Sequence, residues 1–329
     1  MLNSKLKLNK EVFQKDIELK STREGFAAGL IEAAENNESI LSLCADLKHS
    51  TKADLFENKF PNRYLEIGIA EQNMAGIAAG LALSGKIPFI SSLAIFVPGR
   101  NWEQLRLSVC FSNANVKVIG THAGLMHCYD GGMAQALEDI ALTRVLPNMT
   151  VIEPIDYWQA KAVAKFAAKH KGPMYIRLGR EGTPSITTEE TPFDPENAQL
   201  LLEGEDITLI SSGQITYEVL LAARELMSVH KIKPEVISMP VIKPLDEKTL
   251  LRSAKKTKKI ITIENHQISG GLGSAISEVI TENFPVHVHR MGMQDRFGES
   301  GKYHELLDKF GLSAHHIVNQ VLNQIKKNE

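Results

Sequence analysis

Short apolar runs alternate with amphipathic stretches along most of this chain. Runs rich in Ile, Leu and Val that end at turn-forming residues predict buried strands. In the first half these strands are predicted at 39–46, 64–69, 87–94, 116–123, 149–154 and 174–179. Helices are predicted between them, at 22 onward (with Ser21 and Glu24 as a capping box), at 71–83, 102–111 and 134–145, and before 174. This alternation favours a mostly parallel sheet covered by helices.

The alternation breaks once and then restarts. Residues 180–199 are rich in Pro, Thr and Glu and show no period, which predicts an interdomain linker. Strands are predicted again at 206–213, 235–240, 258–265 and 286–293. The predicted fold class is therefore α/β with two domains, 1–190 and 191–329, each a mostly parallel sheet flanked by helices. Residues 1–20 alternate Lys with Leu and are expected to form a solvated arm or edge segment.

Composition excludes several classes of protein. The formal net charge is -2, so no basic excess exists to neutralise a nucleic-acid backbone. No apolar run approaches the roughly 18 residues of a membrane span, and no secretory signal is expected. The three cysteines form no CxxC pair, which indicates reduced thiols and a cytoplasmic location. Four histidines lack zinc-ligand spacing and are interpreted as structural or surface residues: His287, His289, His315 and His316.

Polar and aromatic residues follow several predicted strands, where open parallel sheets bind their ligands. These residues are Ser50, Glu71, Phe96, His122 and Asp130. Taken alone, Glu71 could simply be a first-turn acid that complements the dipole of its helix. The pattern around it changes that interpretation.

The chain resembles the transketolase family over essentially its whole length. The resemblance is carried by 63–85 (RYLEIGIAEQNMAGIAAGLALSG), 87–106, 121–154 and YIRLGR at 175–180. The second half adds SMPVIKPLD, ENHQISGGLGSA and DRFGESG, in the family order. The resemblance implies a pyrimidine-binding domain followed by a transketolase C-terminal domain, and several ordered motifs are far more specific than one short pattern.

The resemblance also implies a thiamine diphosphate site. The family residue that matches Glu71 hydrogen-bonds the aminopyrimidine ring and takes part in proton exchange with it, which is the catalytic role expected of Glu71. Phe96 matches the aromatic residue that stacks on this ring, and Leu93 stands where many relatives carry a second aromatic residue. Arg100, in the same segment, completes the expected cofactor-binding set. An ordinary core role is the alternative for Phe96.

A substrate site is implied by further matches. Arg23, Ser50, His122 and Arg180 match positions that hold the substrate phosphate, and Asp130 matches a residue that contacts a sugar hydroxyl. Two guanidinium groups and two neutral donors suit a phosphate. Surface, turn or buried structural roles are the alternatives for these residues.

One departure concerns the donor end of the sugar. Most relatives have Ser or Thr followed by His where this chain has Met133 and Ala134. His127 is a candidate replacement for the missing histidine. A specialised donor, such as a branched or sulfonated sugar, is the other interpretation.

The family binds thiamine diphosphate through Mg²⁺, which a Gly-Asp-Gly motif and a downstream Asn hold. This sequence has no Gly-Asp-Gly. We therefore expect an N-terminal transketolase subunit to hold the metal, in a heterotetramer of two large and two small subunits that acts on sugar phosphates or related anionic sugars.

Three other interpretations stay open from the sequence. The same glutamate chemistry serves deoxyxylulose-phosphate synthases and the beta subunits of 2-oxoacid dehydrogenases, and a non-catalytic regulatory subunit could keep the fold. A dinucleotide site at Gly271 and Gly273 fits poorly, because Ile276 occupies the place of the third glycine. A tight turn is the preferred interpretation of these glycines.

Overall fold

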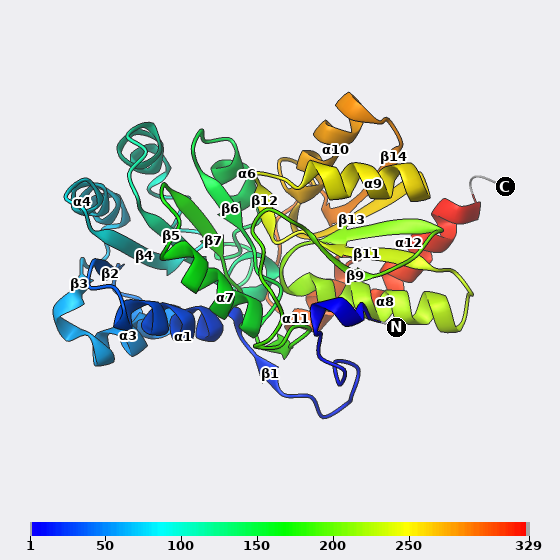
Figure 1. The fold of residues 1–329 in the computed structure, drawn as a ribbon, viewed down its shortest axis with the longest axis horizontal. Helices are drawn as coiled ribbons and strands as arrows, with labels where there is room; N and C mark the ends of the chain where they lie inside the picture. The colour runs from blue at the N-terminus through cyan, green and yellow to red at the C-terminus, as the bar shows by residue number, and fades with distance from the viewer. Residues whose placement is uncertain (1, 327–329) are drawn as a thin grey trace.

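The structure is a computed structural model that describes residues 2–326 as two lobes, each built on a sheet (Figure 1). The sheet of the first lobe has seven strands. Their order is β12 (Val241–Lys243), β6 (Thr150–Ile152), β7 (Met174–Arg177), β5 (Lys117–Thr121), β4 (Ile87–Leu93), β2 (Ile40–Cys44) and β3 (Tyr64–Glu66). All neighbours are parallel except β12 and β6, which are antiparallel.

The second lobe has a five-stranded sheet. Its order is β14 (His287–Met293), β13 (Lys259–Gln267), β10 (Ile207–Ser211), β11 (Pro234–Ser238) and β9 (Gln199–Leu202). Only β9 runs antiparallel to its neighbour. A short antiparallel pair, β1 (Leu19–Lys20) and β8 (Thr183–Pro184), lies apart from both sheets. The predicted α/β fold class, with mostly parallel sheets flanked by helices, is confirmed.

Helices cover both faces of each sheet (Figure 1). The first lobe carries α1 (Thr22–Glu35), α2 (Lys48–Thr51), α3 (Ala53–Lys59), η2 (Pro61–Arg63), α4 (Glu71–Leu83), α5 (Trp102–Gln104), the π-helical η3 (Leu105–Phe111), η4 (Gly124–Met126), α6 (Asp139–Arg144) and α7 (Tyr157–Ala167). The second carries η5 (Gly213–Ile215), α8 (Thr216–Ser228), α9 (Glu247–Thr257), α10 (Leu272–Asn283), α11 (Tyr303–Lys309) and α12 (Ala314–Lys326). None of the helices in residues 2–326 combines the length and apolar character needed to cross a membrane.

Two glycines let α1 lie against α7 with their backbones in contact. A Cβ on Gly25 would lie 2.1 Å from the carbonyl oxygen of Tyr157, and one on Gly29 would lie 2.2 Å from that of Lys161. Any larger side chain at either position would therefore force the helices apart. This packing fixes the N-terminal end of α1, which carries Arg23.

One apolar core runs through both lobes. It joins buried side chains of α4 and β5, such as Met74 and Val118, to side chains of α9 and α10, such as Leu250 and Ile276. Strand β12 also crosses from the second half of the sequence into the first sheet. The lobes are therefore joined by a shared core and a shared sheet, and the boundary near residue 190 stays a prediction.

The expected solvated arm is wrong for part of residues 2–20. Val12 is fully buried and Leu8 nearly so, in the apolar cluster that includes Leu201 of β9. The backbone N–H of Asn3 donates to Leu201 O at 2.9 Å. The segment η1 (Ser4–Leu6) thus lies on the second lobe, because its Leu and Val side chains cover an apolar surface there.

The expected linker is also partly ordered against the first lobe. Ile186 and Thr187 are buried, and their backbone N–H groups donate to the Asp156 carboxylate at 2.7 and 2.6 Å. Burial raises the pKa of Asp156, while these hydrogen bonds act in the opposite direction. Only the later residues, 188–198, are largely exposed or half-buried, as a linker would be.

Candidate active site

The predicted site residues follow the carboxyl ends of strands in the first sheet. Glu71 follows β3, Leu93 ends β4 and His122 follows β5. Leu93 pairs with Thr121 in the parallel register of β4 and β5, and the next N–H, that of Ala94, donates to Thr121 O at 2.7 Å. The register therefore places the predicted cofactor and substrate residues side by side.

Glu71 is a buried carboxylate with one unused oxygen. It is the first residue of α4 and its side chain is 1% exposed. Its Oε2 accepts a hydrogen bond from Arg100 Nη1 at 2.8 Å. Its Oε1 is buried and has no partner in the part of the chain that the structure describes. A buried polar atom without a partner is unfavourable and marks a place for a ligand donor.

Phe96 and Arg100 complete this corner of the site. The guanidinium carbon of Arg100 lies 4.3 Å from the centroid of the Phe96 ring, within cation–π distance. The Arg100 side chain is 45% exposed, whereas Phe96 and Leu93 are half-buried. The corner offers an aromatic face beside a hydrogen-bond acceptor, which suits a flat nitrogen heterocycle such as an aminopyrimidine.

A second group of residues begins with Arg23 on α1. Its Nη1 donates to the backbone carbonyl of Ser50 at 2.7 Å and lies 3.4 Å from His122 Nε2. Ser50, expected as a turn residue, lies in the short helix α2 and meets Arg23 through its backbone oxygen. The Nε of Arg23 is buried with no partner in the described chain. Arg23 therefore keeps donor capacity for a ligand.

His122 is a neutral imidazole in this geometry. Its Nε2 faces Arg23, which can only donate, so the proton lies on Nδ1, 3.0 Å from Thr121 Oγ1. Thr121 Oγ1 in turn donates to Ser92 O at 3.2 Å. Burial, with the nearby charges of Arg23, His127 and Arg180, lowers the pKa of His122 to about 3. His122 also has a left-handed backbone, with φ of 59°.

His127 lies beside His122 and is held at both ring nitrogens. The two imidazole centroids are 5.1 Å apart. His127 Nδ1 lies 2.9 Å from Ala134 O, and Nε2 lies 2.7 Å from Asp130 Oδ2. Both neighbours are oxygen acceptors, which a doubly protonated imidazolium would satisfy. His127 is thus turned towards Ala134, the position of the missing family histidine, through the backbone of that residue.

Asp130 and Arg180 form the exposed side of this group. Asp130 is 60% exposed, and Arg180 Nη1 lies 3.9 Å from its Oδ2. The Arg180 guanidinium carbon lies 5.2 Å from the ring of Tyr129, a residue that no sequence pattern singled out. All six predicted substrate residues therefore fall in one chain of contacts, from Ser50 and Arg23 through the two histidines to Asp130 and Arg180.

The loop that carries Asp130 is held by the second lobe. Gly301 N donates to Cys128 O at 3.0 Å, and Gln135 Nε2 donates to Glu299 O at 3.0 Å. Gly131 has φ of 76°, and a Cβ there would lie 2.5 Å from Ser300 Oγ. The motif at 295–301 therefore shapes the substrate loop from the other lobe.

A buried ionic cluster beneath the site was missed in the sequence. Arg177 donates to Asp139 Oδ2 at 2.8 Å, to Glu153 Oε1 at 2.5 Å and to Asn265 O at 3.0 Å. Asn265 belongs to the second lobe and also accepts from Leu125 N next to the substrate loop. An arginine inside the apolar strand 174–179 was the signal that could have revealed it.

The glycine turn of the second lobe is filled by its own chain. The N–H groups of Leu272 and Gly273, at the start of α10, donate to Glu264 at 2.8 and 3.0 Å. Burial raises the pKa of this carboxyl group to about 8. A Cβ on Gly271 would lie 2.0 Å from Glu264 Oε2. The helix end that a dinucleotide phosphate would use is occupied, so the tight-turn interpretation holds.

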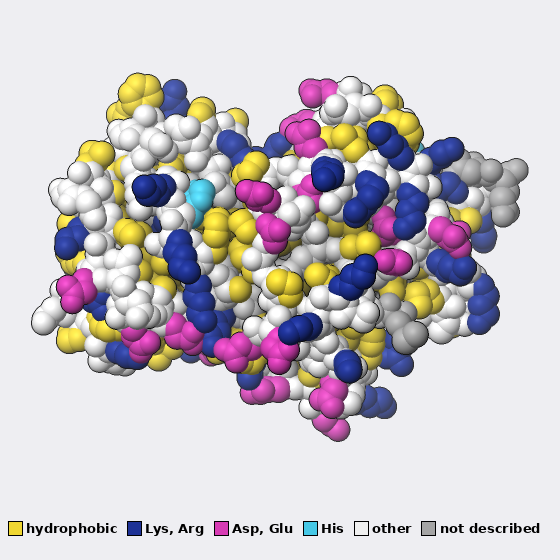
Figure 2. Space-filling model, in the orientation of Figure 1, with side chains coloured by type: hydrophobic (Ala, Val, Ile, Leu, Met, Phe, Trp, Pro, Cys, Tyr) yellow, Lys and Arg dark blue, Asp and Glu magenta, His cyan; other side chains and the backbone are white. Residues whose placement is uncertain are grey.

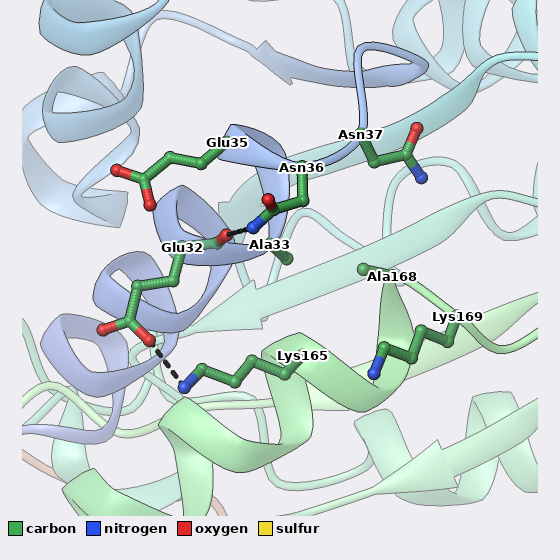
Figure 3. A pocket seen from close by; sticks show the side chains of 8 residues that line it. All are labelled: Glu32, Ala33, Glu35, Asn36, Asn37, Lys165, Ala168 and Lys169. Atoms are coloured by element: carbon green, nitrogen blue, oxygen red, sulfur yellow. Dashed lines mark hydrogen bonds and ion pairs between the residues drawn. The ribbon is translucent and has the colours of Figure 1, made fainter.

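The largest surface groove lies away from these residues. It measures about 630 Å³ and lies between the C-terminal ends of α1 and α7, at the opposite edge of the sheet (Figure 3). Glu32 faces Lys165 across it, with 2.5 Å between the charged atoms. Its facing charges neutralise each other, so it adds nothing to the candidate site. Within residues 2–326 no group of three or more His, Cys, Asp or Glu side chains is placed to hold a metal ion.

Comparison with known proteins follows the two halves of the chain. Residues 19–185 match the family model described as transketolase, pyrimidine binding domain. Residues 196–317 match the one described as transketolase, C-terminal domain. Glu71 and all the predicted site residues lie within the first of these ranges.

Individual relatives match over almost their whole length. The chain is 42% identical to a putative transketolase C-terminal section of Methanocaldococcus jannaschii, over 94% of this chain and 97% of the relative. It is 40% identical to the 6-deoxy-6-sulfo-D-fructose transketolase subunit SqwH of a Clostridium species, over 93% and 95%. It is 34% identical to a subunit of the apulose-4-phosphate transketolase of Phocaeicola vulgatus, over 93% and 97%.

One solved structure is similar throughout. It is titled a split gene transketolase, inactive beta4 tetramer, with a TM-score of 0.87 and 43% identity over 93% of this chain and 98% of that chain.

Proposed function

Because this chain belongs to the transketolase family, we propose that it is the C-terminal subunit of a split transketolase, which transfers a two-carbon ketol unit from a ketose to an aldose. One observation carries the proposal. The buried carboxylate of Glu71 keeps an unpaired oxygen beside the aromatic face of Phe96. A plain first-turn acid on a helix would be exposed and would not need burial of this kind.

The residues present fit the aminopyrimidine ring of thiamine diphosphate. Glu71 would hold or release a proton at a ring nitrogen, Phe96 would stack on the ring, and Leu93 would line the same corner. When bound, this cofactor supplies the nucleophilic carbon and the electron sink for cleavage next to the ketose carbonyl. The catalytic work of this chain is therefore to orient the ring and to manage the proton at Glu71.

The second group of residues supports an anionic sugar as substrate. Arg23 and Arg180 supply two permanent positive charges, and the neutral His122 would contribute hydrogen bonding without a charge. Asp130 would accept from a sugar hydroxyl, with His127 holding it in place. Met133 is 91% exposed, and Ala134 offers no polar side chain at the donor end.

This altered loop supports a specialised ketose. Two relatives are named for 6-deoxy-6-sulfo-D-fructose and apulose 4-phosphate, which are both anionic sugar derivatives. We expect such a sugar to be turned over faster than xylulose 5-phosphate. Equal or better turnover of xylulose 5-phosphate would contradict this part of the proposal.

A partner subunit is proposed to hold Mg²⁺ and the diphosphate, in a heterotetramer. The surface beside Glu71 supports this. On α4, Gly76 and Gly80 have nothing within 4 Å of where a Cβ would lie, and Phe111 of η3 is 82% exposed. Figure 2 shows hydrophobic side chains at the upper end of the first lobe, where these helices lie. An exposed apolar face of this kind marks a protein contact.

The name of the similar structure agrees with this requirement, since it is titled an inactive beta4 tetramer. The three cysteines are free and buried, which supports the proposed cytoplasmic location.

The deciding experiment isolates the tagged chain from its native lysate with thiamine diphosphate and Mg²⁺ present. Mass spectrometry should find one stoichiometric partner that carries Gly-Asp-Gly and a downstream Asn. The reconstituted complex should then convert a ketose and an aldose into the exchanged pair.

Two other outcomes would support the competing functions. Release of CO₂ from pyruvate would indicate a deoxyxylulose-phosphate synthase or 2-oxoacid dehydrogenase type of enzyme. A complex that binds the cofactor but turns over no ketose would indicate a regulatory subunit.

A further inference from the structure

Arg100 occupies both of the contacts that the cofactor ring would need. Its Nη1 donates to Glu71 Oε2 at 2.8 Å, and its guanidinium carbon lies 4.3 Å from the centroid of Phe96. A guanidinium group is flat, carries N–H donors and stacks on aromatic faces, as a protonated aminopyrimidine does. The side chain of Arg100 thus takes up the position in which a ring between Glu71 and Phe96 would lie.

Arg100 and a bound ring exclude each other at this position. A ring cannot stack on the face of Phe96 that the guanidinium covers. The guanidinium also keeps its positive charge at all working pH values, so it would repel a ring that receives a proton at Glu71. Both effects require the Arg100 side chain to leave before the ring is seated.

The side chain of Arg100 is free to leave while its backbone stays in place. Arg100 N donates to Phe96 O at 2.8 Å, and Arg100 O accepts from Gln72 Nε2 at 3.3 Å. The side chain is 45% exposed, so rotation carries it directly into solvent. Glu71 cannot follow, because it is 1% exposed at the start of α4. The pair has one mobile member and one fixed member.

We propose that Arg100 is a placeholder for the aminopyrimidine ring, which occupies the site in the unloaded subunit and is displaced when thiamine diphosphate binds. This inference rests on the proposed function and adds a regulatory step to it. The placeholder shields the Glu71 carboxylate, which would otherwise be buried with no partner at either oxygen. Cofactor loading is then a competition, and the loaded fraction depends on how strongly Arg100 holds the site.

The test measures binding of Mg²⁺–thiamine diphosphate to the reconstituted complex by calorimetry and by stopped-flow fluorescence. The apparent Kd equals the intrinsic Kd divided by the open fraction, so Arg100→Met should tighten binding by about threefold to tenfold and speed association. Arg100→Lys keeps the charge without the flat stacking group, and it should fall between the two. Arg252→Met is the matched control, since Arg252 is exposed on α9 of the other lobe.

The possible results are distinct. Weaker binding in Arg100→Met, with the complex still assembled, would show that Arg100 is a direct cofactor ligand. Unchanged Kd and association rate would show that no competition exists. A wild-type complex that binds no thiamine diphosphate would refute the proposed function itself, and the placeholder with it.

Discussion

Arg177 Nε donates to Asp139 Oδ2 across 2.8 Å, in an ion pair whose side chains are 2% and 1% exposed. Asp139 opens α6, whereas Arg177 ends β7, so the pair ties a helix to the sheet beneath the site. Glu153 accepts from the same guanidinium group, and its other oxygen accepts from Ser212 of the second lobe. Burial alone would lower the pKa of Arg177, but the two carboxylates raise it. The cluster is a charged joint between the lobes.

Loss of Arg177 should therefore destabilise the whole chain. Arg177→Met leaves Asp139 and Glu153 buried without their cation, and breaking a buried pair in this way costs about 3–5 kcal/mol. Urea unfolding of the isolated chain measures the change. Arg252→Met is the control and should stay within about 0.5 kcal/mol of the wild type. A loss below about 1 kcal/mol for Arg177→Met would contradict the proposed joint.

Two glycines in helices should respond in opposite directions to alanine. Gly29→Ala drives a Cβ to 2.2 Å from Lys161 O, and overpacking of this kind costs about 1–3 kcal/mol. Gly80→Ala meets open space in α4 and should stabilise the isolated chain by about 0.5–1 kcal/mol through helix propensity. Thermal unfolding midpoints compare the two variants. Equal midpoints would mean that the close approach of α1 and α7 is not required.

Two equally exposed phenylalanines separate partner binding from general stickiness. Phe111 and Phe297 are both 82% exposed, but only Phe111 lies on the face beside α4. Phe111→Asp should weaken assembly with the partner that holds the diphosphate, by at least about tenfold, because it buries a charge in an apolar contact. Phe297→Asp should leave assembly unchanged. Surface plasmon resonance with the partner measures both, and equal affinities would place the docking face elsewhere.

Glu71→Gln tests the catalytic carboxyl group with little change of shape. The amide can still accept one hydrogen bond but cannot exchange a proton with the ring. Turnover in the reconstituted complex should fall by roughly 10²- to 10⁴-fold, the usual worth of a positioned acid–base group. The circular dichroism spectrum should stay that of the wild type. Near-normal turnover would remove Glu71 from the catalytic role.

His122 should make stability depend on pH below neutrality. Its pKa is about 3 in the folded chain and about 6.5 when unfolded, so between these values only the unfolded chain binds the proton. Stability is therefore retained above pH 6.5 and lost as pH falls towards 3. Arg23, Arg180, His127 and Asp130 are the charged groups around the ring.

Comparison with His122→Asn isolates this contribution. Between pH 7 and pH 5, the unfolding free energy of the wild type should fall by about 1–2 kcal/mol more than that of the variant. Denaturant titrations at the two pH values give the difference. Parallel pH curves would show that His122 is not held neutral by its surroundings.

The local pattern of the sequence was sufficient for the parallel strands but not for the segments between them. The helix predicted at 134–145 begins only at Asp139, because Gln135 donates to Glu299 of the other lobe and Ala136 and Leu137 pack under the loop. The short helices α2 and α3, within 48–59, were expected as a loop. Such segments are decided by contacts distant in sequence, which a single sequence does not display.

The candidate site was predicted to a similar degree. The identities of Glu71, His122 and Asp130 followed from motif order, and the structure brings the predicted substrate residues together in one chain of contacts. The pairing of Arg100 with Glu71 could not be predicted, because it depends on how two side chains orient after both segments have packed. The unused oxygen of Glu71 is likewise a property of the folded chain alone.

Strand β12 has a consequence for how the chain is made. Its Val241 pairs with Ile152 of β6, which lies far earlier in the sequence, so the first sheet lacks one edge until the chain has grown past Lys243. During synthesis on a ribosome, the N-terminal half emerges with that edge of β6 open to other strands. A gene split or truncated near residue 190 would release a half that aggregates. The two halves are therefore expected to be translated, and inherited, as one piece.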